Sequence, residues 1–216
     1  MKKKIIICLI ILNFIFTITT YSKDKKLILD DITIAIDSGH GGKDIGTSYN
    51  NIKEKDINLS ISKYLKEELS KYGANTIMTR EGDYDLSYPN ASLRKKSDFD
   101  NRIKLINESN TKLFISIHQN YYEDSKYNGI QVFYKGNKEL ADYLQNKLNN
   151  KRKAYKISNK LYMYNKLNSD GLLIECGFLS NYKDRKKLRN KAYHKELAIL
   201  IAKNIVEYYK LNNVNS

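Results

Sequence analysis

The chain has 216 residues, a formal net charge of +14 at pH 7, one proline, and no low-complexity stretch or internal repeat. This length and composition favour one domain with a substantial core and leave no linker between domains. The positive charge favours anionic surroundings such as nucleic acid, an anionic membrane or a carboxylate-rich cell wall, although the lysines are spread along the chain as on an ordinary solvated surface.

Residues 1–22 have the pattern of a secretory signal peptide. Three lysines follow Met1, an apolar run begins at Ile5, and the polar exit reads Thr20-Tyr21-Ser22. The run is short for a membrane span, which needs about 20 residues. The exit lacks the alanines typical of a cleavage site, so an uncleaved N-terminal anchor is the alternative. We expect export across the cytoplasmic membrane and a folded domain at 23–216, and export argues against nucleic acid as a partner.

The two cysteines fit this interpretation. Cys8 lies in the N-terminal segment, so Cys176 stands alone in the mature chain and no intramolecular disulfide can form there. A small exported domain without a disulfide is unusual, but this domain is large enough to fold on its core alone. We expect Cys176 to be a buried core residue.

Strands and helices are predicted to alternate along the domain. Apolar, β-branched runs predict strands, and they lie at 32–37, 75–79, 113–118 and 130–134, with a further edge strand at 161–164 and a strand around Glu175. Apolar residues at helical spacing predict helices, and these lie at 54–72, around Phe99–Ile106, around Leu140–Leu148 and at 193–210. A polar connection is expected at 80–98. The alternation predicts an α/β fold with a largely parallel sheet.

Three of the predicted strands end in side chains that carry chemistry. The first runs into Gly39-His40-Gly41-Gly42, the second ends at His118, and the third ends at Glu175. Glycines let the backbone turn sharply and leave room for a close approach. Ligands of open α/β sheets bind outside the carboxyl ends of strands. A buried strand gains nothing from an unpaired carboxylate, so the three ends predict a shared site.

The residue types at these ends suit a zinc hydrolase. Catalytic zinc sites commonly use three protein ligands and leave one position for water. His40 and His118 supply two nitrogens, and Glu54 at the start of a predicted helix is the best candidate for the third ligand. The alternative for Glu54 is an acid that is favoured by the helix dipole. Glu175 suits general acid–base catalysis, since a carboxylate beside the reacting water can take its proton and pass it on.

Three further polar residues have less specific roles in the sequence. Asp37 and Asn120 lie near the two histidines and are candidates for orienting the imidazoles, with ordinary loop capping as the alternative. His194 lies among charged residues on the last predicted helix, and we expect it to be solvated.

Four ordered motifs give the chain a family resemblance. They are Ile36–Asp44 around His40, Glu54 with its helix, Ser116–Asn120 around His118, and Leu173–Asn181 around Glu175. Together they resemble the zinc-dependent N-acetylmuramoyl-L-alanine amidases of bacterial cell walls over nearly the whole mature chain. The resemblance implies a twisted mixed sheet flanked by helices on both faces, zinc ligands at His40, Glu54 and His118, and a catalytic Glu175. The chain departs from the family pattern at Ser169-Asp170-Gly171, where many members have a proline.

Within this family the chain most resembles the germination-specific amidases that act on spore cortex. The features that suggest this are the insertion from Asp85 to Asp98 and the absence of a wall-binding module. The resemblance implies removal of stem peptides from muramic acid as the first step towards muramic-δ-lactam, in the cell wall or the forespore intermembrane space. Two rival hypotheses are a zinc peptidase or carboxypeptidase acting within the stem peptide and a non-catalytic, basic wall-binding protein.

Tyrosines in two predicted connections suggest a protein partner. Tyr84 and Tyr88 lie in one connection, and Tyr121, Tyr122 and Tyr127 lie in another. Tyrosine is enriched at interfaces because its ring supplies a large contact area and a polar tip. The alternative is that these rings line the substrate groove or reflect a tyrosine-rich composition. Activators of related amidases favour a partner, such as a membrane lipoprotein or a cortex-associated protein.

Overall fold

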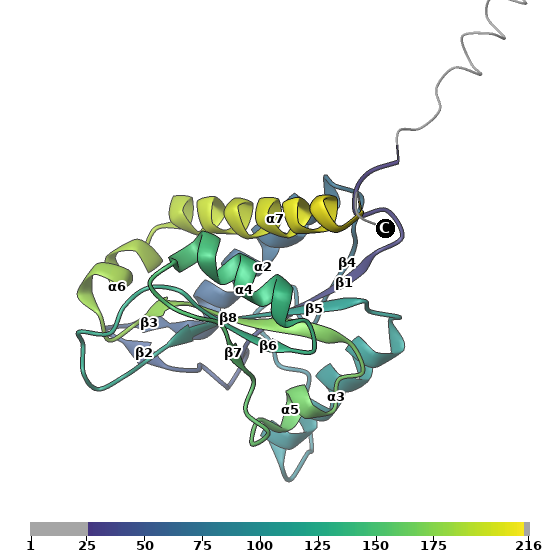
Figure 1. Cartoon of the computed structure of the whole chain (residues 1–216). Helices are drawn as coiled ribbons and strands as arrows, with labels where there is room; N and C mark the ends of the chain where they lie inside the picture. Colours follow the sequence, from purple (N-terminus) through teal and green to yellow (C-terminus); the bar gives the residue numbers. More distant parts are fainter. Residues whose placement is uncertain (1–25, 214–216) are drawn as a thin grey trace, which may run out of the picture.

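The computed structural model describes residues 26–213 (Figure 1), so the predicted signal peptide at 1–22 lies outside the described residues. A mixed sheet forms the centre of the domain. Its strands are β1 (Thr33–Ser38), β4 (Asn75–Met78), β5 (Leu113–Asn120), β6 (Gln131–Lys135), β7 (Tyr155–Lys156) and β8 (Asp170–Phe178). Their order is β4-β1-β5-β8-β6-β7. In this order the first four strands, from β4 to β8, are mutually parallel, whereas β6 runs antiparallel to β8 and parallel to β7.

Helices cover both faces of this sheet. They are α2 (Glu54–Ser70), α3 (Arg94–Glu108), α4 (Lys138–Asn149), α5 (Tyr162–Asn165), α6 (Tyr182–Leu188) and α7 (Lys191–Asn213), and a small hairpin of β2 (Ser48–Tyr49) and β3 (Ile52–Lys53) precedes α2. Figure 1 shows α2, α4 and α7 on one face and α3 with α5 on the other. The predicted single α/β domain with a mostly parallel mixed sheet is confirmed.

The core holds the strand ends in place from both sides. Ile34 and Ile36 of β1 face the apolar cluster under α2, α4 and α7, whereas Ala35 faces the smaller cluster under α3 and α5. All three are fully buried, as expected of a central parallel strand that is covered on both faces. Cys176 is also buried and forms no disulfide, as predicted from the sequence.

The structure corrects the prediction of an edge strand at 161–164. That segment forms α5, and the edge position belongs to β7. Met163 and Tyr164 are adjacent in sequence and both buried, a pattern that one helical turn permits and an alternating edge strand does not.

One helix boundary and one short helix also escaped the sequence pattern. The connection predicted at 80–98 is shorter, because α3 begins at Arg94 with a polar first turn. Helix α6 was not predicted, since it is short and charged, and the Asn181 side chain caps it by accepting hydrogen bonds from Lys183 N and Asp184 N.

His194 lies in the core and is not solvated as predicted. Its side chain is on α7, the residue is only 5% exposed, and its Nε2 donates a 2.7 Å hydrogen bond to Leu188 O. Nδ1 lies 2.8 Å from Ser60 Oγ on α2. Burial lowers the pKa of this imidazole below its ordinary value of 6.5. His194 therefore joins α7 to α2 and to the last residue of α6 as a neutral side chain.

This burial predicts a pH-dependent contribution to stability. Below about pH 6.5 the unfolded chain binds a proton at His194 that the folded chain resists, so the free energy of unfolding should fall as pH decreases. His194→Leu should destabilise the protein by about 1–3 kcal/mol at pH 7.5, because Leu188 O and Ser60 lose their partner. Denaturant titrations at pH 7.5 and 5.5 should show the gap between wild type and variant narrowing at the lower pH. A gap that is constant or wider at pH 5.5 would contradict a buried neutral His194.

Candidate active site

The carboxyl ends of three neighbouring parallel strands form the candidate site. β1 leads directly into Gly39 and His40, His118 lies near the end of β5, and Glu175 lies near the end of β8. His118 and Glu175 are register partners across the β5–β8 pair. The predicted convergence of the three strand ends is therefore present in the fold.

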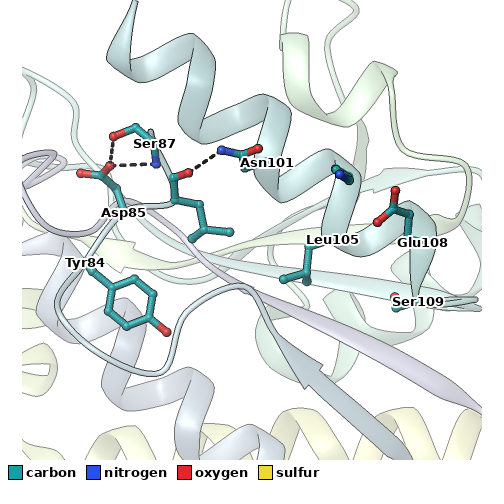
Figure 2. Close-up of a pocket in the computed structure, with 9 residues that line it drawn as sticks. Tyr84, Asp85, Ser87, Asn101, Leu105, Glu108 and Ser109 are labelled. Atoms are coloured by element: carbon teal, nitrogen blue, oxygen red, sulfur yellow. Dashed lines mark hydrogen bonds between the residues drawn. The ribbon is translucent and has the colours of Figure 1, made fainter. Parts of the chain in front are cut away.

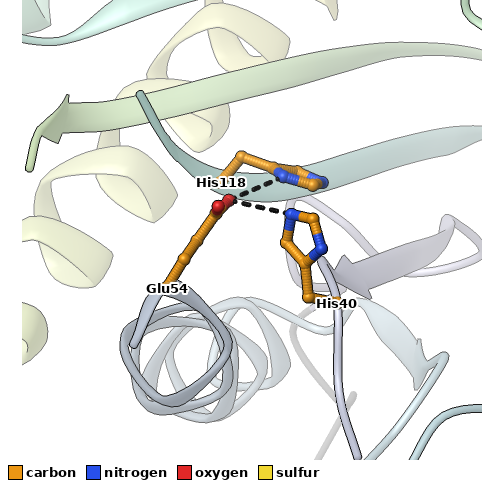
Figure 3. A group of neighbouring side chains, drawn as sticks. All are labelled: His40, Glu54 and His118. Atoms are coloured by element: carbon orange, nitrogen blue, oxygen red, sulfur yellow. Dashed lines mark hydrogen bonds and ion pairs between the residues drawn. The ribbon is translucent and has the colours of Figure 1, made fainter. Parts of the chain in front are cut away.

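His40, Glu54 and His118 point at one another (Figure 3). Glu54 Oε1 lies 2.9 Å from His118 Nδ1 and 3.2 Å from His40 Nε2. One ligand atom from each residue lies within 4.8 Å of the other two. Two imidazole nitrogens and one carboxylate oxygen are a donor set that zinc accepts, with a fourth position left for water or substrate. The side chains thus fit a catalytic zinc ion.

Glu54 enters the site from the first residue of α2, where it is 3% exposed. Its two oxygens also accept hydrogen bonds from backbone N–H groups, Oε2 from Thr47 at 2.8 Å and Oε1 from Gln119 at 3.0 Å. Burial acts to raise the pKa of this carboxyl, but the bonds and charges of His118 and His40 outweigh it and hold the pKa well below its usual range. Glu54 is therefore a fixed carboxylate.

A second carboxylate, that of Asp44, lies beside the other ring nitrogen of His40. Nδ1 lies 3.0 Å from Asp44 Oδ2. Burial acts to lower the pKa of His40, and Asp44 and Glu54 together raise it to about 9. Without a cation the cluster thus holds a proton on His40, and binding of a metal at this position would release it.

Two glycines are required by the packing of these side chains. A Cβ on Gly39 would lie 2.3 Å from His118 Nε2, and a Cβ on Gly46 would lie 2.6 Å from Glu54 Oε2. Gly46 also has a φ of +66°, in the left-handed region. The space left by these two glycines is therefore occupied by side chains of the candidate site, His118 and Glu54.

Glu175 lines a cavity together with two of the candidate ligands, and its Oε2 has no hydrogen-bond partner in the described part of the chain. The cavity measures about 370 Å³ and is lined by His40, His118 and Glu175 together with other charged side chains and with apolar ones that include Met163 and Leu173. Among the described residues, Glu175 Oε2 is buried and has no partner. Burial raises the pKa of Glu175 to about 7, with the histidines acting to lower it and Glu54 to raise it. Such a carboxyl can exchange a proton near neutral pH.

The structure does not place Asp37 or Asn120 on an imidazole. Asp37 accepts hydrogen bonds from Arg102 Nη1 at 2.7 Å and from the Ser116 hydroxyl at 2.6 Å. Asn120 Oδ1 accepts from the next backbone N–H, Tyr121 N, at 2.8 Å, which is the capping alternative. Besides Glu54, the acid that contacts an imidazole is Asp44, which pairs with His40 and which the sequence interpretation missed although it lies four residues after His40.

A second, more open cavity lies beside α3 and measures about 600 Å³. Figure 2 shows it between the loop that carries Tyr84, Asp85 and Ser87 and the helix face with Asn101 and Leu105. This loop begins the insertion noted in the sequence, and Asn101 Nδ2 holds it by a 2.6 Å bond to Leu86 O. The proposed zinc ligands and Glu175 do not line this cavity, so the 370 Å³ cavity is the candidate catalytic one.

Comparison with known proteins agrees with the fold and the motifs. Residues 34–207 match the family described as N-acetylmuramoyl-L-alanine amidase. The germination-specific N-acetylmuramoyl-L-alanine amidase of Bacillus subtilis (strain 168) is 37% identical over 216 residues, which span 94% of this chain and 91% of that protein.

Two solved structures from one species are also similar. The CwlD amidase from Clostridioides difficile, solved in complex with the GerS lipoprotein, superposes with a TM-score of 0.78 at 35% identity, over 83% of this chain and 99% of that one. An N-acetylmuramoyl-L-alanine amidase from Clostridium difficile 630 gives 0.71 at 30% identity, over 83% and 97%. These matches span most of the described residues, and the chain therefore belongs to the N-acetylmuramoyl-L-alanine amidases, the enzyme family that its four motifs predict.

Proposed function

We propose that this amidase is zinc-dependent, with His40, Glu54 and His118 as ligands and Glu175 as the catalytic acid–base. The observation that carries the proposal is the convergence of one atom from each of the three ligands within 4.8 Å, next to a buried carboxyl oxygen without a partner. The bond to be cleaved is the amide between the lactyl group of N-acetylmuramic acid and L-alanine in peptidoglycan.

The side chains divide the work of hydrolysis between them. When bound, zinc would supply a Lewis acid that polarises the amide carbonyl and makes a water more acidic. Glu175, across from His118 in the β5–β8 pair, accepts a proton from the attacking water and then donates it to the nitrogen of the leaving alanine. Water thus adds across the C–N bond, leaving a muramic carboxylate and a peptide with a free amine. Asp44 lies against Nδ1 of His40 as an ion-pair partner and favours the ring orientation that turns Nε2 towards Glu54.

Product analysis on purified peptidoglycan tests this assignment. We expect release of stem peptides whose free amino group belongs to L-alanine, together with intact muramic acid. A zinc peptidase or carboxypeptidase would instead cut within the stem, and a non-catalytic wall-binding protein would release nothing. Absence of zinc from the purified, active enzyme would contradict the metal assignment independently.

We further propose spore cortex as the substrate, as the first step towards muramic-δ-lactam and in support of germination. The support is the similarity to the germination-specific relative over most of both chains. Export fits this location. Residues 1–22 would direct it as a signal peptide or anchor, and a reporter fused to this segment should appear outside the cytoplasmic membrane. No helix within residues 26–213 is long and apolar enough to cross a bilayer.

A protein partner, such as a lipoprotein, is part of the proposal. Its support is the similarity to an amidase solved with a lipoprotein and the exposure of all five tyrosines that suggested an interface from the sequence. Tyr122 and Tyr127 pack edge to face in one loop, with ring centroids 4.9 Å apart. Rings that are held together and left in water are suited to cover a partner surface.

Substitution in this loop should weaken partner binding without loss of the fold. We expect Tyr122→Ala combined with Tyr127→Ala to reduce retention of the partner by at least about tenfold, which corresponds to about 1.4 kcal/mol. The measurement is co-purification from an extract of sporulating cells, followed by titration with the purified partner. Tyr155→Ala is the matched control, since Tyr155 is 57% exposed on β7, where its ring packs against Phe133, outside both loops. Equal retention by both variants would contradict an interface at this loop.

A further inference from the structure

Two buried arginines lie beneath the loop that carries His40. Arg80 follows β4 and Arg102 belongs to α3, and each is only 1% exposed. The loop leaves the sheet after Ser38. His40 has a φ of 61°, in the left-handed region that residues other than glycine seldom adopt. Such a conformation persists only where surrounding contacts enforce it.

The guanidinium groups hold three consecutive carbonyl oxygens of this loop. Arg80 Nε donates to Ser38 O at 2.9 Å, and Arg80 Nη2 donates to Gly39 O at 3.0 Å. Arg102 donates to Ser38 O at 2.9 Å from Nη1 and to His40 O at 2.8 Å from Nη2. The backbone on either side of the His40 side chain is therefore clamped by charge-assisted hydrogen bonds.

The two arginines differ in how their charge is balanced. Arg102 forms ion pairs with Asp37 at 2.7 Å and with Asp98 at 3.0 Å. Arg80 forms no ion pair with a described carboxylate, and its hydrogen bonds go to carbonyl oxygens only. A buried charge without a counterion is costly. The arrangement of its acceptors shows what this charge accomplishes.

Arg80 joins the backbones of two proposed ligands. Besides Ser38 and Gly39, which precede His40, its Nη2 donates a 2.7 Å hydrogen bond to Lys55 O, the residue directly after Glu54. The remaining contact, from Nη1 to Gly82 O at 2.9 Å, anchors the guanidinium to the chain beyond β4. One planar, rigid group thus spans the His40 loop and the start of α2.

We propose that Arg80 is a positioning residue that sets the spacing between His40 and Glu54 and thereby the affinity of the site for zinc. This inference rests on the proposed function, in which these two residues are zinc ligands. A lysine cannot replace Arg80, since one ammonium group cannot reach the four carbonyl oxygens that the guanidinium fork engages.

Zinc affinity of Arg80→Lys tests the proposal. Lysine keeps the positive charge of this position. Because Arg80 forms no ion pair with a described carboxylate, the substitution also leaves no buried acid unpaired. We expect zinc binding to weaken by about 10- to 100-fold in competition with a chelator, as is typical when a residue that orients a ligand is lost. The visible spectrum of the cobalt-substituted protein should change as well, because the spacing of the ligand atoms changes.

A stability-matched control separates positioning from general support of the fold. Leu144 is fully buried in α4, outside the site, so Leu144→Ala should lower stability by about 2–5 kcal/mol. It should leave zinc affinity and the cobalt spectrum unchanged. Zinc affinity of Arg80→Lys within twofold of wild type, or a loss equal to that of Leu144→Ala, would overturn the proposal.

The remaining outcomes are also decisive. If Arg80→Lys does not fold, Arg80→Met replaces it, since methionine fills similar space without a charge. If neither variant folds, Arg80 is required for the fold, and the positioning assignment is wrong. If the wild-type protein itself binds no zinc, the proposed function fails first, which is a different result from normal zinc binding by the variant.

Discussion

Replacement of His118 by alanine is expected to remove bound zinc and activity together. His118 Nδ1 lies 2.9 Å from Glu54 Oε1 and supplies one of two nitrogens in the cluster. Loss of a residue that only orients a ligand costs about 10- to 100-fold in metal affinity or activity, so loss of a ligand itself should cost more than that. Metal content of the purified variant, measured with its amidase activity, gives the result directly.

A second histidine variant serves as the control for this experiment. His194→Leu also removes a buried imidazole, but His194 contacts Ser60 and Leu188 and lies outside the cluster. This variant should lose stability and keep its zinc. A His118→Ala protein that is fully active without metal would refute zinc dependence, and zinc retained at full stoichiometry would refute His118 as a ligand.

The strand ends were predictable because buried parallel strands have a simple sequence pattern. Ile34–Ile36 is a continuous apolar run, and such a run predicts a strand that is covered on both faces. Parallel strands end at the same edge of a sheet, so a histidine or glutamate at each end implies one site. Glu54 required more, because a helix start carries acids for reasons of its own.

The support beneath the site was not visible in local patterns. Arg80 and Arg102 act on carbonyl oxygens of the His40 loop, which lies 41 to 64 positions away in the chain, and sequence spacing carries no trace of such contacts. A signal did exist for Arg102, which lies at helical spacing between Phe99 and Ile106 on the inward face of α3.

The same kind of signal explains the errors at His194 and Asp37. His194 lies four residues before Ala198 and seven before Ile201, on the buried stripe of α7, but its charged neighbours suggested a solvated position. Asp37 alternates with Ile36 along β1 and so points to the face of the sheet that α3 covers. The face of a helix or strand on which a residue lies can be deduced from the sequence period. For His194 and Asp37 that face predicted the surroundings of the side chain better than the neighbouring residues in sequence did.

Replacement of Glu175 by glutamine is expected to keep the zinc and abolish most turnover. Glutamine has nearly the same shape but cannot accept a proton from the attacking water, and loss of a general acid–base costs about 10²- to 10⁴-fold. Zinc content should equal that of wild type, since the ligands are His40, Glu54 and His118. Loss of zinc from this variant would mean that Glu175 is a ligand, and full turnover would exclude it from catalysis.

Stability and pH provide an independent check on the role of Glu175. Burial raises its pKa to about 7, so between the ordinary value of 4.5 and about 7 the folded metal-free protein binds more protons than the unfolded chain. Stability conferred by this group is therefore lost as pH rises through that window. Metal-free Glu175→Gln should be more stable than wild type at pH 7.5, because the amide removes a negative charge from a side chain whose buried Oε2 has no partner. Denaturant titrations in the presence of a chelator measure this difference. A variant that is less stable than wild type at pH 7.5 would show that Glu175 supports the fold, whereas greater stability with lost turnover identifies a carboxylate retained for its chemistry.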